Sequence, residues 1–248
     1  MSQRTVALAW AGLRPRDEPS ADEGLRERKK RLMRQQLSDT ATEMFLARGF
    51  DTVRVAEIAE ACGVSEKTVF NYFPTKESLV LDLGDAVEDA LRSTLADPRL
   101  APVQAALKIL SDQLAAITSW LATQRDQARA VEQFRHFGML IRSTPSLRAY
   151  QRDTTERLIT VAAEVLAQRT GLSPRDPEPQ IAARALLALW PIQFQGLDTY
   201  LDDTRTPEQL HQAVTAHVNR AARLIVTGLS SFTAPTTDTP PATTGTRD

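Results

Sequence analysis

Apolar residues recur three and four positions apart along almost the whole chain after residue 28, and strand-like alternation is nearly absent. This spacing is typical of helices that each bury one apolar face. In the first part of the chain it predicts helices over about 25–48, 55–62, 65–72 and 75–95. In the remainder it predicts helices over about 103–121, 128–142, 145–165, 181–200 and 207–229. The fold class is therefore predicted to be all-α.

Residues with known preferences for helix ends support several of these boundaries. Gly49 followed by the apolar Phe50 is the expected chemistry of a helix that stops in the left-handed region. Ser65 is placed to cap a short helix, and Thr206 with Gln209 forms a capping box at the start of the last helix.

A chain of 248 residues is longer than one average domain, so a small domain joined to a larger one is expected. We assign residues 26–83 to a three-helix domain and residues 84–230 to a larger helical domain. The Thr- and Pro-rich tail over 231–248 is predicted to be disordered. Residues 1–25 are interpreted as a disordered or arm-like leader, although a faint signal-peptide pattern and a wrongly assigned start codon are alternatives.

Composition narrows the functional classes. Hydrophobic residues at 42% and charged residues at 25% are the balance of an ordinary folded protein. The single cysteine, Cys62, cannot form an internal disulfide, and the three histidines are not spaced like a structural zinc site. The longest apolar stretches fall short of the roughly 20 residues that a membrane-spanning helix needs. We expect a cytoplasmic protein without a metal or cofactor and without a membrane partner.

The segment 55–72 carries the most informative pattern. Ile58 and Ala59 lie in one short predicted helix, Gly63 relieves a tight turn, and Val69 lies in a second short helix. Small and apolar residues at these positions let two helices pack closely, as in a helix-turn-helix whose second helix enters the major groove of DNA. A plain helical corner has the same spacing, so the pattern alone leaves both interpretations open.

The wider run from Leu37 to Leu79 resembles the amino-terminal DNA-binding domain of TetR-type transcriptional regulators. The matching residues are Ala41, Phe45, Gly49, Phe50, Ile58, Ala59, Gly63, Val64, Ser65, Thr68, Phe70, Tyr72, Phe73, Pro74, Lys76, Glu77 and Leu79. Two departures, Arg54 in place of a common threonine and Lys67 in place of a common glycine, both add positive charge. The resemblance implies a helix-turn-helix domain followed by an all-helical ligand-binding and dimerisation domain.

Several residues are candidates for DNA contact, with a solvated surface role as the alternative for each charged one. The candidates for base edges are Glu66, Lys67, Thr68 and Asn71, since Lys suits guanine acceptors and Asn can pair with adenine. Further DNA-binding candidates are Thr52, Arg54, Ser65, Tyr72 and Lys76. For Tyr72 and Lys76, the resemblance implies contacts with phosphates. Val69, Phe70, Phe73, Ile58 and Cys62 are expected to pack the domain.

Positive charge is concentrated near the start of the first helix. The formal net charge is −1, yet the run Arg26–Arg34 carries six positive residues and one negative residue, Glu27. Such a run is usually a solvated face. Beside a helix-turn-helix it is better interpreted as an arm that follows the DNA backbone or enters the minor groove.

The larger domain contains aromatic residues that could line a ligand cavity. They are Trp120, Phe134, Phe137, Trp190 and Phe194. Pockets are typically apolar with a few orienting polar groups, but a filled core has the same composition. Pro191 is expected to kink the apolar helix over 181–200 and to free a carbonyl.

These expectations together describe a homodimeric transcriptional regulator, most simply a repressor that binds a palindromic operator and is released by a small, largely apolar ligand. The last two helices are the expected dimer surface, with apolar seams from Leu186, Leu189, Leu210, Val214, Ala221 and Ile225. The alternative is a helix-turn-helix regulator whose C-terminal domain binds a protein partner. An enzyme is not expected, because the sequence contains no nucleophile elbow, phosphate loop or zinc-protease motif.

Overall fold

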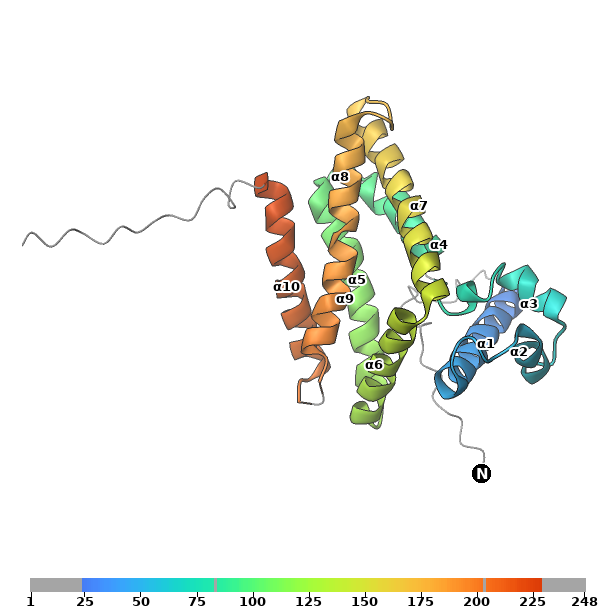
Figure 1. Ribbon diagram of the computed structural model, residues 1–248. Helices are drawn as coiled ribbons and strands as arrows, with labels where there is room; N and C mark the ends of the chain where they lie inside the picture. Colours follow the sequence, from blue (N-terminus) through green and yellow to red (C-terminus); the bar gives the residue numbers. More distant parts are fainter. Residues whose placement is uncertain (1–23, 83, 203, 229–248) are drawn as a thin grey trace, which may run out of the picture.

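The computed structural model describes residues 24–82, 84–202 and 204–228. Within these ranges every regular element is helical, which confirms the predicted fold class. A group of three helices at the amino-terminal end lies beside a larger bundle (Figure 1). The predicted leader over 1–25 and tail over 231–248 lie almost entirely outside the described residues.

The amino-terminal group consists of α1 (Leu25–Arg48), α2 (Val55–Ala61) and α3 (Glu66–Tyr72). Helix α1 stops at Gly49, whose φ of 85° favours glycine and whose N–H donates to the Phe45 carbonyl at 2.8 Å. The Phe45 and Phe50 rings then meet with their centres 4.9 Å apart. Of the side chains expected to pack this group, Ile58, Cys62, Val69 and Phe73 are buried at its centre, together with Leu37 and Phe45 of the first helix.

The connection to the bundle differs from the single helix predicted over 75–95. It is divided into a 3-10 turn, η2 (Glu77–Leu79), a short α4 (Gly84–Ala90) and a π-helical segment, η3 (Leu91–Leu95). At the start of this connection Thr75 Oγ1 accepts from the Ser78 N–H at 3.1 Å. At the end of this turn Ser38 Oγ of α1 donates to the Leu79 carbonyl at 3.0 Å, which attaches the connection to α1.

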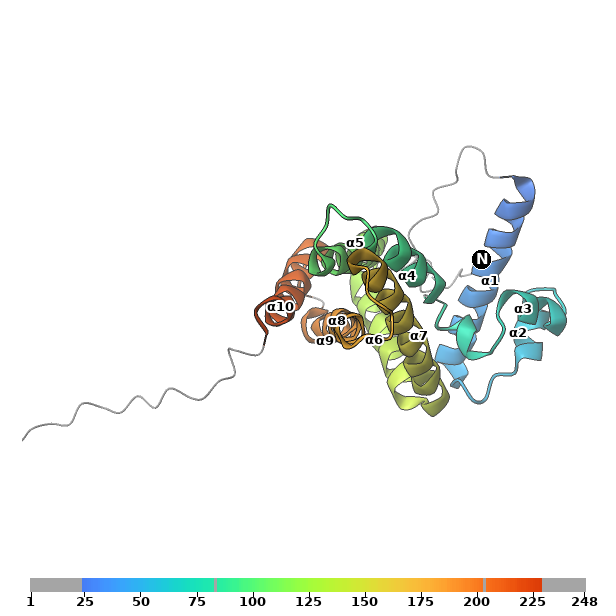
Figure 2. The ribbon, with the colours of Figure 1, turned by 90° about the horizontal axis from the view of Figure 1, so that it is seen from above.

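The larger bundle follows the predicted order of helices. Its elements are α5 (Pro102–Thr123), α6 (Gln127–Ser143), α7 (Pro145–Thr170), α8 (Pro177–Leu187), α9 (Leu189–Tyr200) and α10 (Pro207–Thr227). Helix α7 packs on α8, and α10 packs on both α9 and α5. In both views α10 lies on the side of the bundle away from α1, α2 and α3 (Figures 1 and 2). The predicted capping box of α10 is confirmed, since Thr206 and Gln209 each accept the other's backbone N–H.

The apolar segment 181–200 is not the single buried helix that its composition predicts. It divides at Ala188 into α8 and α9. Pro191 has no N–H to donate to the Leu187 carbonyl one turn earlier, and α8 ends at that residue. One face is also open to solvent, because Ile181 is 67% exposed.

Most of the predicted dimer seam lies inside the protomer. Leu186, Leu189, Leu210 and Val214 are all buried within the bundle, because α10 covers α9 and α5 in the same chain. A second copy of the chain cannot reach these four side chains without displacing α10. The other two residues of the predicted seam, Ala221 and Ile225, are partly exposed.

None of the described helices is both long enough and apolar enough to cross a membrane.

Candidate nucleic-acid interface

Helix α3 presents one outward face with a mixed polar and apolar character. Val69 and Phe73, four positions apart, are fully buried in the core of the domain. Their burial fixes the orientation of α3. Lys67, Phe70 and Asn71 are exposed. Positions three and four apart share a face of a helix, so these three side chains project together from the domain.

Phe70 corrects the sequence analysis, which expected it to pack the domain. Its side chain is 45% exposed, although the residue before it is fully buried. The seven-residue α3 buries only the side that carries Val69, and a residue one position further on points about 100° away from that side. An exposed phenyl ring on this face can make apolar contact with the methyl group of a thymine.

The start of α3 is fixed by Ser65 and Thr68. Ser65 Oγ accepts the Thr68 N–H at 3.1 Å and lies 2.8 Å from Thr68 Oγ1. The predicted cap at Ser65 is therefore confirmed. Both hydroxyls are engaged in the cap, so any contact they make with DNA would share these hydrogen bonds.

The basic run at the start of the domain is helical, as the predicted helix over 25–48 requires. Helix α1 begins at Leu25, so the run Arg26–Arg34 occupies its first turns. A surface groove of about 790 Å³ separates these turns from α3. Its lining residues are Leu25, Arg26, Lys29, Lys30 and Met33 from α1, with Thr68, Asn71 and Tyr72 from α3. The fold thus brings the cationic run and three of the predicted contact residues to one surface.

Helix α2 has an unusual amino-terminal end at Arg54. The Glu57 carboxylate accepts the Arg54 backbone N–H at 2.7 Å and an Arg48 Nη2 hydrogen at 2.8 Å. The Arg54 amide, followed by the Arg48 guanidinium, lowers the pKa of Glu57 below its usual value. The Arg54 side chain itself is 81% exposed, and Thr52 is also exposed in the loop before α2. Both residues are therefore open to a partner.

Lys76 lies in the turn after α3, against aromatic rings. Its Nζ is 4.5 Å from the centre of the Phe50 ring and 5.6 Å from that of Phe45. Burial lowers the pKa of the Lys76 ammonium, and the nearby Asp51 and Glu77 carboxylates raise it in part. This side chain has a packing role beside the phosphate contact that the resemblance implies.

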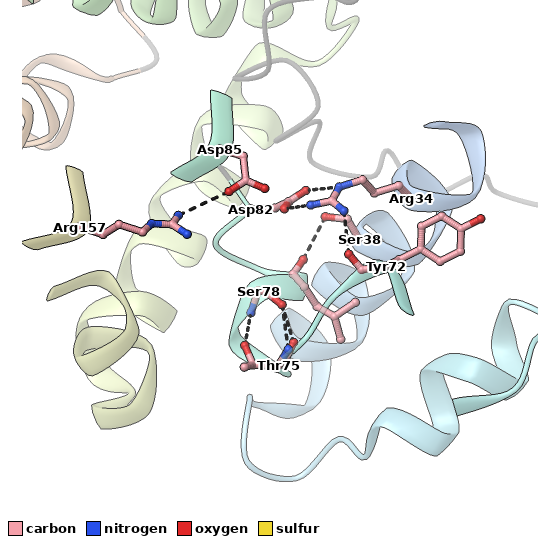
Figure 3. Close-up of polar contacts among 9 residues, drawn as sticks. Arg34, Ser38, Tyr72, Thr75, Ser78, Asp82, Asp85 and Arg157 are labelled. Carbon is pink, nitrogen blue, oxygen red and sulfur yellow. Dashed lines mark hydrogen bonds and ion pairs between the residues drawn. The ribbon is translucent and has the colours of Figure 1, made fainter. Parts of the chain in front are cut away.

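Arg34, the last residue of the basic run, contacts several parts of the domain. Its guanidinium binds both carboxylate oxygens of Asp82, and Nη1 donates to the Tyr72 carbonyl at 2.7 Å (Figure 3). The same group lies 4.6 Å from the centre of the Phe73 ring. The sequence indicated Arg34 only as one of the six positive residues of the run Arg26–Arg34. Its position one turn before the buried Leu37 was the available signal that it faces the domain interior.

The aromatic residues predicted to line a ligand cavity come from α5, α6 and α9. Phe137 is fully buried, and Trp120, Phe134, Trp190 and Phe194 are partly buried against the same core. Trp190 Nε1 is buried without a hydrogen-bond partner. Helix α6 is joined to α9 by the Arg142–Asp198 ion pair at 2.7 Å and by Arg135, which donates to the Leu201 carbonyl at 2.6 Å.

A small cavity lies at the end of the same three helices, with Leu121, Val131, Leu201 and Leu210 in its wall. Its volume is about 20 Å³. That space accommodates a water molecule, whereas ligand pockets typically measure about 300 to 1,000 Å³.

The fold and this surface define a DNA-binding protein of the helix-turn-helix class. The family model for bacterial regulatory proteins of the tetR family matches residues 37–83. The model for the MftR C-terminal domain matches residues 115–230. The two matches fall on the two parts of the structure.

Individual relatives agree with these matches. The HTH-type transcriptional regulator TcmR of Streptomyces glaucescens is 32% identical over 157 residues, which cover 62% of this chain and 67% of that protein. The HTH-type transcriptional repressor LfrR of Mycolicibacterium smegmatis is 34% identical over 99 residues, 39% of this chain and 49% of the relative. A solved structure assigned to the TetR family, from Mesorhizobium loti, is 21% identical and covers 80% of this chain and 98% of its own, with a TM-score of 0.43. The chain belongs to the TetR family of bacterial transcriptional regulators.

Proposed function

We propose that the protein is a homodimeric repressor that binds a palindromic operator and is released by a small, largely apolar effector. The observation that carries the proposal is the shared surface of α3 and the first turns of α1. On this surface the exposed Lys67, Phe70 and Asn71 lie beside a groove with three cationic side chains in its wall, Arg26, Lys29 and Lys30.

The α3 side and the α1 side of this surface have different roles in DNA recognition. Side chains of α3 have the hydrogen-bonding and apolar groups that distinguish bases in the major groove: Lys67 for guanine, Asn71 for adenine and Phe70 for a thymine methyl. The lysines of α1 are long, flexible point charges suited to phosphates, which fix register without reading sequence. In a twofold-symmetric dimer, this arrangement predicts half-sites about 34 to 36 Å apart, or a multiple of that distance.

Selection of random duplex DNA by the purified protein tests this proposal. We expect an enriched palindrome, whose affinity is then measured across salt concentrations. Asn71→Ala should change the preferred base at one position of each half-site. The double variant Lys29→Ala/Lys30→Ala should weaken binding to all sequences and reduce the slope of log K against log salt by about 2.

Lys108→Ala is the matched control for the lysine variants. Lys108 is an exposed lysine of α5, paired with Asp112 at 2.8 Å and remote from α3 in the fold. Its loss should leave both affinity and salt slope unchanged. Failure of the wild-type protein to enrich any sequence would refute the operator proposal, and equal effects of the α1 and α3 variants on every sequence would refute the division of labour.

The effector proposal rests on the aromatic residues between α5, α6 and α9. The Nε1–H of the partly buried Trp190 has no hydrogen-bond partner, and a polar group on an otherwise apolar ligand could accept a hydrogen bond from it. The cavity at the end of these helices has a volume of only about 20 Å³, and we propose that effector binding displaces α6 or α9. That movement is the source of the change in operator affinity, since a ligand acts only through its different affinities for two states.

The apolar probe 1-anilinonaphthalene-8-sulfonate tests whether such a site opens. We expect saturable binding to the dimer that lowers operator affinity and is weakened by Phe194→Ala. Leu172→Ala removes an exposed apolar side chain outside these helices and should have no effect. Saturable binding that leaves operator affinity unchanged would contradict the effector proposal.

The dimer surface is assigned to the apolar residues that the protomer leaves uncovered on its last helices. Ile181 of α8 and Leu224 and Val226 of α10 are exposed, and α8 and α10 are in contact. Ile181→Glu should convert the dimer to a monomer in sedimentation and weaken operator binding. Leu172→Glu, which also charges an exposed leucine, should leave the dimer intact. A wild-type protein that sediments as a monomer at operator-binding concentrations would overturn this assignment.

A further inference from the structure

We propose that Arg34 and Asp82 are positioning residues for the DNA-binding surface, and that the neighbouring Asp85–Arg157 ion pair ties them to α7 of the larger bundle. The inference rests on the proposed operator binding, which it extends by naming the contacts that connect the bundle to α3. None of these residues is required to touch DNA.

The first step is the way in which Arg34 holds the end of α3. One guanidinium binds the Asp82 carboxylate through two nitrogens, donates to the Tyr72 carbonyl and covers the Phe73 ring. Tyr72 is the last residue of α3, so its carbonyl is one of those that the helix itself cannot satisfy. A cation is also favoured at a helix carboxyl end. Arg34 therefore fixes both the position and the orientation of that end relative to α1.

The second step is the pair of carboxylates on the connecting segment, Asp82 and Asp85, which lie three positions apart. Figure 3 shows Asp82 directed toward Arg34 and Asp85 directed toward Arg157. The Arg157 Nη2–Asp85 Oδ1 distance is 3.5 Å. Asp82 is largely covered, with a side chain 10% exposed, so its pairing with Arg34 is screened less than that of a surface pair. The short connecting segment thus receives one arginine from the DNA-binding part and one from the bundle.

Gly84 lets α7 approach this segment closely. A Cβ on Gly84 would lie 2.5 Å from Arg157 Nη2 and 3.0 Å from Thr154 Cγ2. The lack of a side chain at position 84 is what leaves room for the arginine beside its partner Asp85. Glycine at position 84 therefore permits the close contact between α7 and the connection.

Helix α7 also holds the rest of the connection. Arg169 donates to the carbonyl of Leu95, the last residue of η3, at 2.6 Å. It also donates to the Leu100 carbonyl, in the loop before α5, at 2.7 Å. Arg92 of η3 lies 3.6 Å from Glu164 of α7. Because α7 follows α6 after only Thr144, a displacement of α6 is passed to α7 and then to the segment that carries Asp82 and Asp85.

A double-mutant cycle on the selected operator tests the connection. The variants are Arg157→Gln, Asp82→Asn and the two combined, with affinity measured across salt concentrations and folding checked by thermal unfolding. We expect Arg157→Gln to lower affinity about threefold with an unchanged salt slope, because an exposed ion pair has a small energy and Arg157 neutralises no phosphate. Asp82→Asn should lower affinity more than Arg157→Gln does. The fold-loss in affinity of the combined variant should be smaller than the product of the fold-losses of the two single variants.

Arg184→Gln is the matched control. Arg184 also forms an exposed ion pair with α7, 3.8 Å from Glu156, but it reaches α7 from α8 and not from the connection. Its loss should leave operator affinity unchanged. If Arg184→Gln and Arg157→Gln had the same effect, the result would reflect the stability of α7, and the proposed tie would be wrong.

Two more variants separate the tie from general destabilisation. Gly84→Ala should displace the flexible Arg157 guanidinium and reproduce the affinity loss of Arg157→Gln, although alanine favours helix more than glycine does. The exchanged pair Asp85→Arg/Arg157→Asp should recover affinity relative to Arg157→Asp alone. Independent effects of Arg157→Gln and Asp82→Asn, with no recovery in the exchanged pair, would overturn the proposal.

Hydrogen exchange at the α3 amides gives a readout that needs no operator. Arg157→Gln should accelerate exchange at the end of α3, and Arg184→Gln should not. Unchanged exchange in Arg157→Gln would refute the tie even if the operator were found, whereas accelerated exchange without any enriched operator would leave the tie standing and refute the proposed function.

Discussion

The Lys76 ammonium lies over the Phe50 ring, 4.5 Å from its centre, and joins the turn after α3 to the loop after α1. A lysine at this position is therefore held by its own domain before any DNA arrives. Its preformed position lowers the conformational entropy that a phosphate contact would cost, because a free lysine side chain loses about 2 kcal/mol of rotamer freedom when it is fixed.

Lys76→Met should lower the affinity of the protein for DNA and change its stability little. Methionine keeps the apolar stem and loses a cation–π contact of about 0.5 to 1 kcal/mol, but it also removes the cost of burying the ammonium, so we expect the free energy of unfolding to change by less than about 1 kcal/mol. If Lys76 also contacts a phosphate, affinity should fall for every duplex and the salt slope should decrease by about 1. Denaturant titration and operator binding measure the two effects separately. An unchanged salt slope would assign Lys76 to packing alone.

Phe70 should read the methyl group of a thymine in each half-site. Replacement of that thymine by deoxyuridine removes only the methyl group and should weaken binding by the wild-type protein. Phe70→Ala should lower affinity for the thymine operator and abolish the difference between the two duplexes. Systematic deoxyuridine substitution along the selected operator identifies the position. If no thymine-to-uridine change affects the wild-type protein, Phe70 has no such role.

Glu57 should make the amino-terminal domain sensitive to acid. Its carboxylate accepts the Arg54 amide and an Arg48 guanidinium hydrogen, and these contacts lower its pKa in the folded state. A lowered folded pKa means that the stabilising effect is complete above the unfolded pKa of about 4.3 and is lost as the pH falls through the folded value. Glu57→Gln should therefore have a lower Tm than the wild type at pH 7, and the difference should shrink below about pH 4.

Glu60→Gln is the control for that experiment. Glu60 is an exposed glutamate of the same helix, and its removal should leave the acid dependence of Tm unchanged. A Glu57→Gln difference that stays constant from pH 7 to pH 3 would show that ionisation of the Glu57 carboxylate is not the source of the stabilisation.

Local chemistry made the helix ends of this chain predictable. Gly49, Ser65 and Thr206 each act within a few residues of their position, and the structure has the predicted stop or cap at all three. The buried face of the amino-terminal group was also predictable, because apolar spacing in a short helix specifies one side. The all-helical fold class of the remainder was predictable from the same apolar spacing, and the resemblance of the helix-turn-helix segment to the TetR family agrees with it.

The errors come from contacts between residues far apart in the sequence. Ser38 donates to the Leu79 carbonyl 41 positions later, in a connection that apolar spacing predicted as one continuous helix. Leu186 and Leu210 have the apolar character of an interface, but both are buried within the protomer, where α10 packs on α9 and α5. The pairing of Arg34 with Asp82 likewise joins residues 48 positions apart, which no local pattern indicates.

Ser65 offers a way to separate the structure of α3 from its contact with DNA. Its hydroxyl accepts the Thr68 N–H, so Ser65→Ala should cost about 1 kcal/mol of stability and also weaken operator binding. Ser65→Asp keeps an acceptor at the cap and places a negative charge at a helix amino end, so its Tm should match that of the wild type. If Ser65 also lies against the DNA backbone, the added carboxylate should repel phosphate and reduce affinity for all duplexes, most strongly at low salt. Thermal unfolding and salt-dependent binding of the two variants distinguish these effects. A Ser65→Asp protein with wild-type stability and wild-type affinity would restrict Ser65 to the cap and remove it from the DNA-contacting residues.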